Sequence, residues 1–232
     1  EGKSNIIKSV DIALNELKKR KSEFLIYSKS LGLEEEIEKN LEWSTKLKIA
    51  LQEDRVVPFF QPILNNQTRR IEKYEALVRL IESDGSIVSP AMFLGVAKKT
   101  KQYLEITKKV IEKSFETFKD NNFEFSINLT MEDIMSEEII ELLERKVNDN
   151  EMNRVIFEIV ESEGIEDIQK VSNFIKKSKE CGCKIAIDDF GTGYSNFEYL
   201  IKMSPDCIKI DCSMIKDIDI DIDNEDIINT II

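Results

Sequence analysis

Carboxylate, amide and ammonium side chains interrupt the apolar stretches of this sequence where a buried strand would otherwise continue. They are Glu75, Asn128, Glu158, the adjacent pair Asp188 and Asp189, and Lys209 with Asp211. Burying a carboxylate is costly unless it is paired or bound to a cation. One such residue is as often structural as functional, but their recurrence in successive stretches predicts a metal ion.

The atoms on offer indicate which metal and which reaction. Carboxylate and amide oxygens favour Mg²⁺, Mn²⁺ or Ca²⁺ over zinc. Asp188 and Asp189 could each face one of two ions, and two ions about 3.5–4 Å apart stabilise the attacking and leaving oxygens of a phosphoryl displacement. Phosphodiester hydrolysis is therefore the leading chemistry.

Two basic residues and a turn could assist this reaction. Arg79 could hold a phosphate through two hydrogen bonds, although a surface ion pair is an equally common role for such a residue. Lys209 lies between two isoleucines and could steady the attacking water or the developing charge. The glycine-rich turn at 191–194 could equally be a simple strand-to-helix connection.

The overall composition excludes several functional classes. The chain has 232 residues, 41% of them hydrophobic, with a net charge of −12 and no histidine. Serine–histidine and cysteine–histidine nucleophile pairs are therefore impossible, and the charge argues against binding a nucleic acid polymer. The apolar runs are too short to cross a bilayer and the N-terminus lacks a signal peptide, so we expect a cytoplasmic location.

Four cysteines fall in two close pairs, a number that would suit zinc. They are Cys181, Cys183, Cys207 and Cys212. The spacings within the pairs differ from the usual zinc-binding pattern, and reduced structural thiols are the favoured interpretation.

Alternating strand and helix patterns from residue 55 onward predict a mainly parallel α/β sheet. Strands are expected at 56–63, 73–80, 123–129, 154–160, 183–189 and 207–212, and helices at 137–147 and 166–181. An open sheet and a closed barrel both fit this order. The polar residues favour a (β/α)₈ barrel, because the carboxyl ends of its strands converge on one face.

The first 55 residues have a different character. The pattern predicts a helix over 4–20, a strand over 22–30 and a charged amphipathic helix over 33–52. This part is more typical of a connector than of an independent fold.

Six ordered motifs then carry a family resemblance from residue 56 to the end. They read FFQPI, YEALVRL, SINL, FEIVES, DDFGTGYS and IKID. This order resembles the EAL-domain cyclic di-GMP phosphodiesterases. The preceding text, VDIALNELKK and SEFLIYSK, resembles the last helix and strand of a GGDEF (diguanylate cyclase-like) domain. The implied divisions are a GGDEF-like tail at 1–30, a connector helix at 31–54 and the EAL domain at 55–232.

The resemblance implies a modified TIM barrel whose first strand is antiparallel, and it implies a role for each matching residue. The implied metal ligands are Glu75, Asn128, Glu158 and Asp188, with Asp189 serving the second metal and the catalytic water, and Lys209 as the catalytic lysine. The dinucleotide would be held by Gln61, Leu77 and Arg79, and the loop would be stabilised by Glu161, Gly191, Thr192 and Gly193. The implied reaction opens cyclic di-GMP to linear pGpG with Mg²⁺ or Mn²⁺ and is inhibited by Ca²⁺. A homodimer through this domain is also implied.

Some features depart from the family pattern. Val160 replaces the usual threonine and Asn196 the usual serine. The family's seventh and eighth strands, with a further catalytic glutamate, are not in the sequence, so we expect a fragment truncated after the sixth strand that hydrolyses weakly or not at all.

Three alternatives to the phosphodiesterase remain. The first is a catalytically inactive EAL domain that senses cyclic di-GMP. The second is an unrelated metal-dependent barrel enzyme, such as a lyase that stabilises an enolate. The third is a barrel whose acids are only structural.

Overall fold

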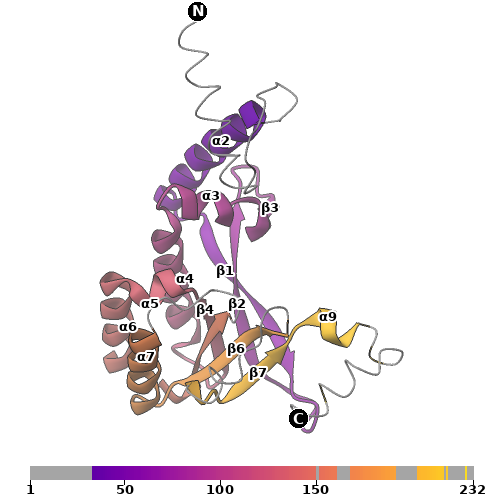
Figure 1. Cartoon of the computed structure of the whole chain (residues 1–232), viewed down its shortest axis with the longest axis vertical. Coiled ribbons are helices and arrows are strands. Elements are labelled where there is room, and N and C mark those ends of the chain that lie inside the picture. The colour runs from indigo at the N-terminus through magenta and orange to yellow at the C-terminus, as the bar shows by residue number, and fades with distance from the viewer. Residues whose placement is uncertain are drawn as a thin grey trace, which may run out of the picture.

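The computed structural model describes residues 33–149, 152–160, 168–191, 203–216, 218 and 228. Helices and strands alternate along most of this length (Figure 1). The helices are α2 (Leu33–Gln52), α3 (Leu94–Lys99), α4 (Tyr103–Phe118), α5 (Met131–Met135), α6 (Glu137–Asp149), α7 (Ile168–Glu180) and α9 (Cys212–Ile215). The strands are β1 (Val56–Leu64), β2 (Ile71–Ile81), β3 (Ile87–Val88), β4 (Glu124–Leu129), β5 (Val155–Val160), β6 (Lys184–Phe190) and β7 (Cys207–Ile210). Short 3₁₀ turns cover Pro90–Met92 and Met152–Arg154.

The strands form one sheet in the order β1-β2-β4-β5-β6-β7, with β3 paired to β2. β1 runs antiparallel to β2, and every later neighbour along that path is parallel. The α/β class, the mainly parallel sheet and the antiparallel first strand are as predicted. Within the described residues the sheet does not close into a barrel.

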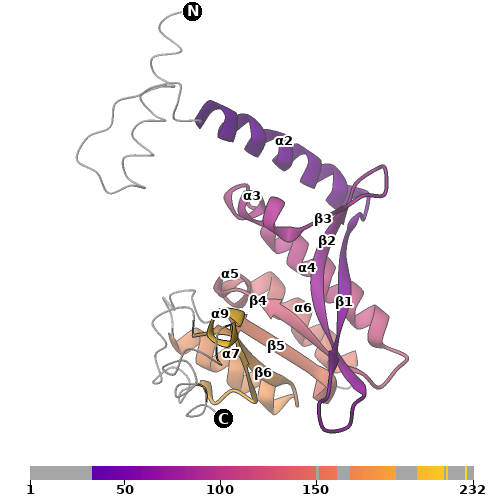
Figure 2. The same ribbon diagram turned by 90° about the vertical axis from the view of Figure 1, so that its right-hand side faces the viewer.

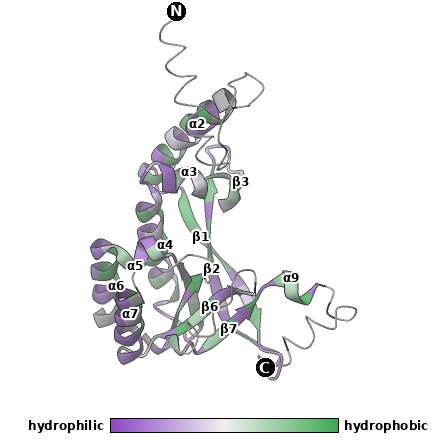
Figure 3. Ribbon diagram, viewed as in Figure 1, coloured by the Kyte–Doolittle hydropathy of each residue, from purple (hydrophilic) through white to green (hydrophobic). Residues whose placement is uncertain are grey.

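Helices α4, α6 and α7 lie together on one face of this sheet (Figures 1 and 2). Side chains of a strand alternate between its two faces, and the residues directed at the helices are apolar. On β4 they are Phe125, Ile127 and Leu129, each at most 2% exposed. The Phe125 ring stacks on Phe118 of α4 with the ring centroids 4.7 Å apart. Helices α6 and α7 carry many hydrophilic residues (Figure 3). The main apolar layer is therefore the core between these helices and the sheet.

The six predicted strands begin and end within two residues of the observed ones, and β3 was not predicted. We expected a strand over 207–212, but β7 ends at Ile210. Asp211 instead caps α9, because its side-chain oxygen Oδ1 accepts a hydrogen bond from the Ser213 backbone N–H at 2.8 Å. The predicted helix at 4–20 and strand at 22–30 lie outside the described residues.

Helix α2 extends from the body of the molecule and is anchored through its C-terminal half (Figure 2). Leu47 and Ala50 are fully buried and Trp43 is 9% exposed, whereas Leu41, nearer the N-terminal end, is 68% exposed. Gln102 also donates a hydrogen bond to the Ser44 carbonyl at 3.3 Å. The second half of α2 is therefore continuous with the core of the sheet domain.

Among the described residues, no helix combines the length and the apolar character needed to cross a membrane.

The anchoring of α2 predicts different costs for two leucines on the same helix. Leu47→Ala should lower the free energy of unfolding by about 2–5 kcal/mol, because it leaves a cavity in the core. Leu41→Ala should change it by no more than about 0.5 kcal/mol. Denaturant titration of both variants checks this, and equal effects would contradict the packing described.

Candidate metal centre

Most of the polar residues singled out from the sequence lie on the face of the sheet opposite the helices: Glu75, Asn128, Glu158, Asp188 and Lys209. Asn128 on β4 pairs in register with Glu158 on β5, and Val160 on β5 pairs with Asp188 on β6. Glu75 on β2 is in register with Ser126, two residues before Asn128. Because these strands are parallel neighbours, one side chain from each can reach a common point.

Lys209 on β7 lies among three of these carboxylates. Its Nζ is 2.6 Å from Glu158 Oε2, 3.0 Å from Asp188 Oδ2 and 3.3 Å from Glu75 Oε2. The Glu158 side chain is 3% exposed and the Lys209 side chain 28%. Such close contacts within a largely enclosed site make Lys209 the counter-charge of the cluster rather than a solvated surface residue.

Two further hydrogen bonds fix the orientation of the oxygens. Asn128 Nδ2 donates to Glu75 Oε1 at 3.2 Å, which leaves the Asn128 carbonyl oxygen Oδ1 as the atom that could bind a cation. The Asp189 backbone N–H donates to Asp188 Oδ1 at 3.0 Å. Glu75 and Asp188 are thus each held through a second oxygen, in addition to the oxygen that contacts Lys209.

The pKa values of Glu158 and Lys209 are each affected by burial and, in the opposite direction, by the ion pair between them. Burial raises the pKa of Glu158, although the hydrogen bond from Lys209 acts in the opposite direction. Burial alone would lower the pKa of Lys209, but Glu158, Asp188 and Glu75 together raise it above its usual value. One ammonium group is therefore shared by three carboxylates, which leaves the cluster with surplus negative charge.

The donor set fits a hard divalent cation. One oxygen from each of Glu75, Glu158 and Asp188 lies within 4.8 Å of the other two. Two oxygens on opposite sides of an ion bonded at about 2.1–2.5 Å are roughly 4.2–5 Å apart. These three residues with Asn128 would hold Mg²⁺, Mn²⁺ or Ca²⁺ with small side-chain adjustments.

A β-bulge explains how two adjacent aspartates can serve this face. Ile187 pairs with Ile208, but the next pair is Phe190 with Ile210, so β6 has one extra residue here. In a regular strand, Asp188 and Asp189 would point to opposite faces. Because of the bulge, Asp189 does not enter the apolar core. Phe190 lies in the core instead, where it is 1% exposed.

Asp189 itself lies outside the cluster of three carboxylates. Its φ of 54° is in the left-handed region, which is unusual for a residue other than glycine. Partial burial raises the pKa of Asp189, and the charges of Asp188 and Asp211 raise it further. The carboxylate is thus within the electric field of the site, and its predicted role at a second metal stays a prediction.

The residues expected to hold the dinucleotide share this face with the cluster. Gln61 on β1 is opposite Glu75, and Leu77 and Arg79 follow Glu75 at two-residue intervals on β2. Among the described residues Arg79 makes no ion pair, and its Nη1 donates to the Val78 carbonyl at 2.8 Å. The surface ion pair considered for Arg79 is therefore not formed there.

The expected loop residues are described only in part. Gly191 has a φ of 101°, so this position requires the conformational freedom of glycine. Glu161, Thr192 and Gly193 lie outside the described residues.

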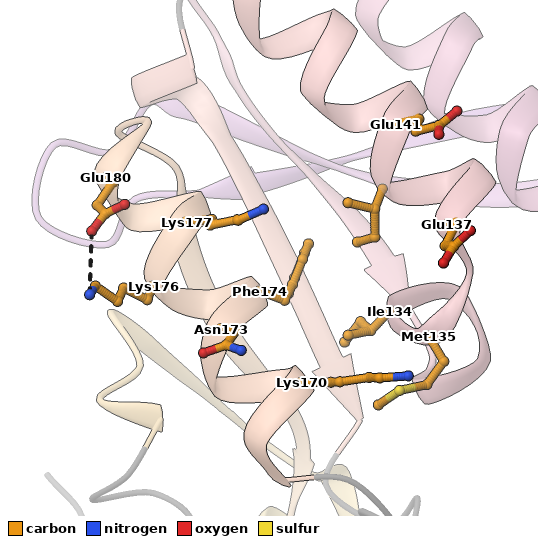
Figure 4. A pocket seen from close by; sticks show the side chains of 11 residues that line it. Ile134, Met135, Glu137, Glu141, Lys170, Asn173, Phe174, Lys176, Lys177 and Glu180 are labelled. Atoms are coloured by element: carbon orange, nitrogen blue, oxygen red, sulfur yellow. Dashed lines mark ion pairs between the residues drawn. The ribbon is translucent and has the colours of Figure 1, made fainter.

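A groove of 590 Å³ opens on the other side of the sheet, between α5, α6 and α7 (Figure 4). Ile134, Ile140 and Phe174 contribute apolar surface, and lysines and glutamates of the two longer helices complete the lining. None of the residues predicted for catalysis lines this groove.

The four cysteines are all free thiols, as predicted, but only Cys183 is buried. Cys181, Cys207 and Cys212 are exposed. A structural role through burial therefore applies to Cys183 alone, where burial raises the pKa of the thiol to about 12.

The sequence of the whole region matches a known family. The profile of the EAL domain matches residues 44–232. The chain belongs to the EAL-domain family. The match begins within the anchored half of α2, which agrees with the burial of Leu47 and Ala50 in the core.

Two curated proteins illustrate the relationship of this EAL domain to longer chains. It is 31% identical over 235 residues to the signaling protein YkoW of Bacillus subtilis, covering 98% of this chain and 29% of YkoW. It is 29% identical over 187 residues to the cyclic di-GMP phosphodiesterase PdeB of Shewanella oneidensis, covering 76% of this chain and 22% of PdeB. The chain thus spans less than a third of the length of these two relatives.

Solved EAL structures share the fold. The EAL enzyme Bd1971, solved with cAMP and cyclic di-GMP bound, superposes with a TM-score of 0.78 at 24% identity, covering 96% of this chain and 62% of that one. The Bacillus subtilis YkuI protein, solved with its substrate c-di-GMP and calcium, gives a TM-score of 0.63 at 27% identity, covering 76% and 45%.

The sharing of Lys209 by three carboxylates predicts a metal-sensitive variant. Without added metal, Lys209→Met should lower the free energy of unfolding by roughly 1–3 kcal/mol, less than a fully buried pair because Lys209 is partly exposed. Mn²⁺ should then raise the melting temperature more than in the wild type, because the carboxylates have lost their competing cation.

Lys184→Met is the matched control, since Lys184 pairs with Glu124 on the same face of the sheet. Its response to Mn²⁺ should equal that of the wild type. Equal Mn²⁺ shifts for all three proteins in thermal melts would contradict the site.

Thiol labelling tests the burial of Cys183. In the native protein at pH 8, iodoacetamide should modify Cys181, Cys207 and Cys212 and leave Cys183 unmodified, because a buried thiol of raised pKa forms almost no thiolate. Unfolding in urea should expose all four. Peptide mass spectrometry reads the result, and native labelling of Cys183 at the rate of the others would refute its burial.

Proposed function

We propose that this EAL domain binds cyclic di-GMP and hydrolyses it to linear pGpG with the help of divalent cations. The observation that carries the proposal is the convergence of Glu75, Glu158 and Asp188 from three parallel strands around Lys209. A fold does not need such surplus negative charge on one face, whereas a phosphoryl-transfer site does.

The residues of the chain would act at separate points of the substrate. Arg79 follows Glu75 by four residues on β2 and therefore lies on the same face of the strand. It would donate hydrogen bonds to a phosphate. Lys209 would hold the attacking water by a hydrogen bond and stabilise the charge that develops on the phosphate oxygens. Water adds to one phosphorus, one P–O3′ bond breaks, and the leaving 3′ oxygen takes up a proton.

Glu75, Asn128, Glu158 and Asp188 would hold the first cation, and Asp189 would serve the second. The cations supply a lowered pKa for the bound water and neutralise the phosphate charge. Mg²⁺ or Mn²⁺ would support turnover, whereas Ca²⁺, with longer bonds and a looser geometry, would permit binding and inhibit turnover.

The names of the relatives support this proposal. PdeB is named a cyclic di-GMP phosphodiesterase, and YkuI was solved with c-di-GMP and calcium together. The relatives therefore favour cyclic di-GMP as the substrate. The acidic cluster of this chain favours metal-dependent hydrolysis.

Other parts of the proposal rest on the sequence. They are a GGDEF-like tail at 1–30 followed by a connector helix at 31–54, a homodimer formed through the EAL domain, loop stabilisation by Glu161, Thr192 and Gly193, and a cytoplasmic location.

Glu75→Gln tests the function without a change in side-chain size. Because the amide removes one negative oxygen from the proposed cation site, we expect Ca²⁺-dependent binding of cyclic di-GMP to fall at least tenfold and Mn²⁺-dependent formation of pGpG to fall at least a hundredfold. Calorimetry measures the binding in this chain, and chromatography of the nucleotides measures turnover in the full-length protein.

Glu72→Gln is the matched control. Glu72 lies on the same strand but is hydrogen-bonded to Asn65 and Thr68, away from the cluster. Binding without turnover in the full-length wild type would favour the sensor alternative. If neither this chain nor the full-length wild type binds cyclic di-GMP, the proposal is refuted.

A further inference from the structure

The bulge at Asp188 and Asp189 places strain at the edge of the proposed metal centre. Asp189 has a φ of 54° and Gly191 a φ of 101°, so two residues of this short segment have left-handed backbone. Aspartate adopts left-handed backbone more readily than most residues other than glycine, but this conformation still has a cost that surrounding contacts can offset. Contacts that pack against this turn would therefore help to keep it in place.

The contact that meets the turn most closely comes from helix α9. A Cβ built on Gly191 would lie 1.8 Å from Met214 Sδ and 2.9 Å from Met214 Cγ. The Met214 side chain thus occupies the space that any larger residue at 191 would need. Met214 is 7% exposed, so it is buried against this turn although α9 is only four residues long.

One backbone hydrogen bond joins the start of α9 to the same turn, and a second lies within the first turn of α9. The Asp211 N–H donates to the Phe190 carbonyl at 3.1 Å, and the Met214 N–H donates to the Asp211 carbonyl at 3.1 Å. The Asp211 cap described above completes the start of the helix. The path from Met214 to Asp189 therefore runs through one packed contact and a short, hydrogen-bonded piece of backbone.

We propose that Met214 is a positioning residue for the paired aspartates. Its thioether packs on Gly191 and holds the bulge in the form that keeps Asp188 beside Lys209 and Asp189 on the same side of the sheet. Met214 touches neither a cation nor a substrate in this role. The inference rests on the proposed metal centre, since it assigns to α9 the support of two of that centre's carboxylates.

Truncation of Met214 should weaken metal binding more than its effect on stability explains. In Met214→Ala the turn can relax toward ordinary strand geometry, and the affinity for Mn²⁺ should fall about 10- to 100-fold, as when a partner that orients a ligand is lost. Met214→Leu keeps a similar volume and should restore the affinity to within about threefold of the wild type.

Met203→Ala is the matched control, because Met203 is 8% exposed in the main core. It should lower the melting temperature without changing the affinity for Mn²⁺. Mn²⁺ affinity is measured by calorimetry and by the electron paramagnetic resonance signal of free Mn²⁺, and thermal melts report stability for each variant.

The outcomes separate this inference from the proposed function. If the folded wild type binds no Mn²⁺, the proposed metal centre fails. If the wild type binds Mn²⁺ and Met214→Ala binds it equally well, or if Met203→Ala weakens binding as much, the positioning role is overturned. If Met214→Ala does not fold, Met214→Leu and Met214→Val decide, since affinity should fall in Val, which is too short to fill the space, and not in Leu.

Discussion

The charge balance around Lys209 is the constraint on which the site depends. Three carboxylates from β2, β5 and β6 share one ammonium group on a face of the sheet where solvent is restricted. Removing such groups from water is costly, and a single lysine offsets only part of the repulsion among them. The sheet can carry this arrangement because its opposite face is apolar and packs against α4, α6 and α7.

The division of the sheet into a polar and an apolar face follows from strand alternation. On β4 and β5 the two faces differ at every step, so that Asn128 and Glu158 face the site while Phe125 and Phe157 are buried under the helices. Strand β6 departs from this alternation at its bulge. The bulge there accommodates two consecutive aspartates without burying either in the core. An apolar strand can therefore end in two adjacent negative charges.

Much of this architecture could be predicted from the sequence because the apolar stretches are short, well bounded and separated by helical patterns. The strand predicted at 56–63 is observed as Val56–Leu64. Of the polar residues expected to converge from successive strands, Glu75, Asn128, Glu158, Asp188 and Lys209 do so, whereas Asp189 lies outside the cluster of three carboxylates and Asp211 caps α9. The end of β7 was misplaced, because Asp211 in IKIDC fits a strand pattern as well as it fits the cap of a helix. The exposure of three cysteines was also missed, since local pattern does not report burial.

The bulge and the contact of Met214 with Gly191 were not predicted, although the sequence contains a signal for the first. Apolar positions Ile185 and Ile187 are odd-numbered, and the next core residue, Phe190, is even-numbered, which is the parity change that one extra residue produces. The contact with Met214 joins residues 23 positions apart and arises only when β7 and α9 fold against β6, so no local pattern could indicate it.

Crystals of the chain grown with Mn²⁺, with anomalous diffraction recorded at the manganese edge, would test the central claim most directly. We expect an anomalous peak bonded at about 2.0–2.6 Å to oxygens of Glu75, Glu158 and Asp188, with Lys209 displaced from at least one of them. A peak elsewhere, or no peak while all three carboxylates remain bonded to Lys209, would contradict the assignment of this face as a metal centre.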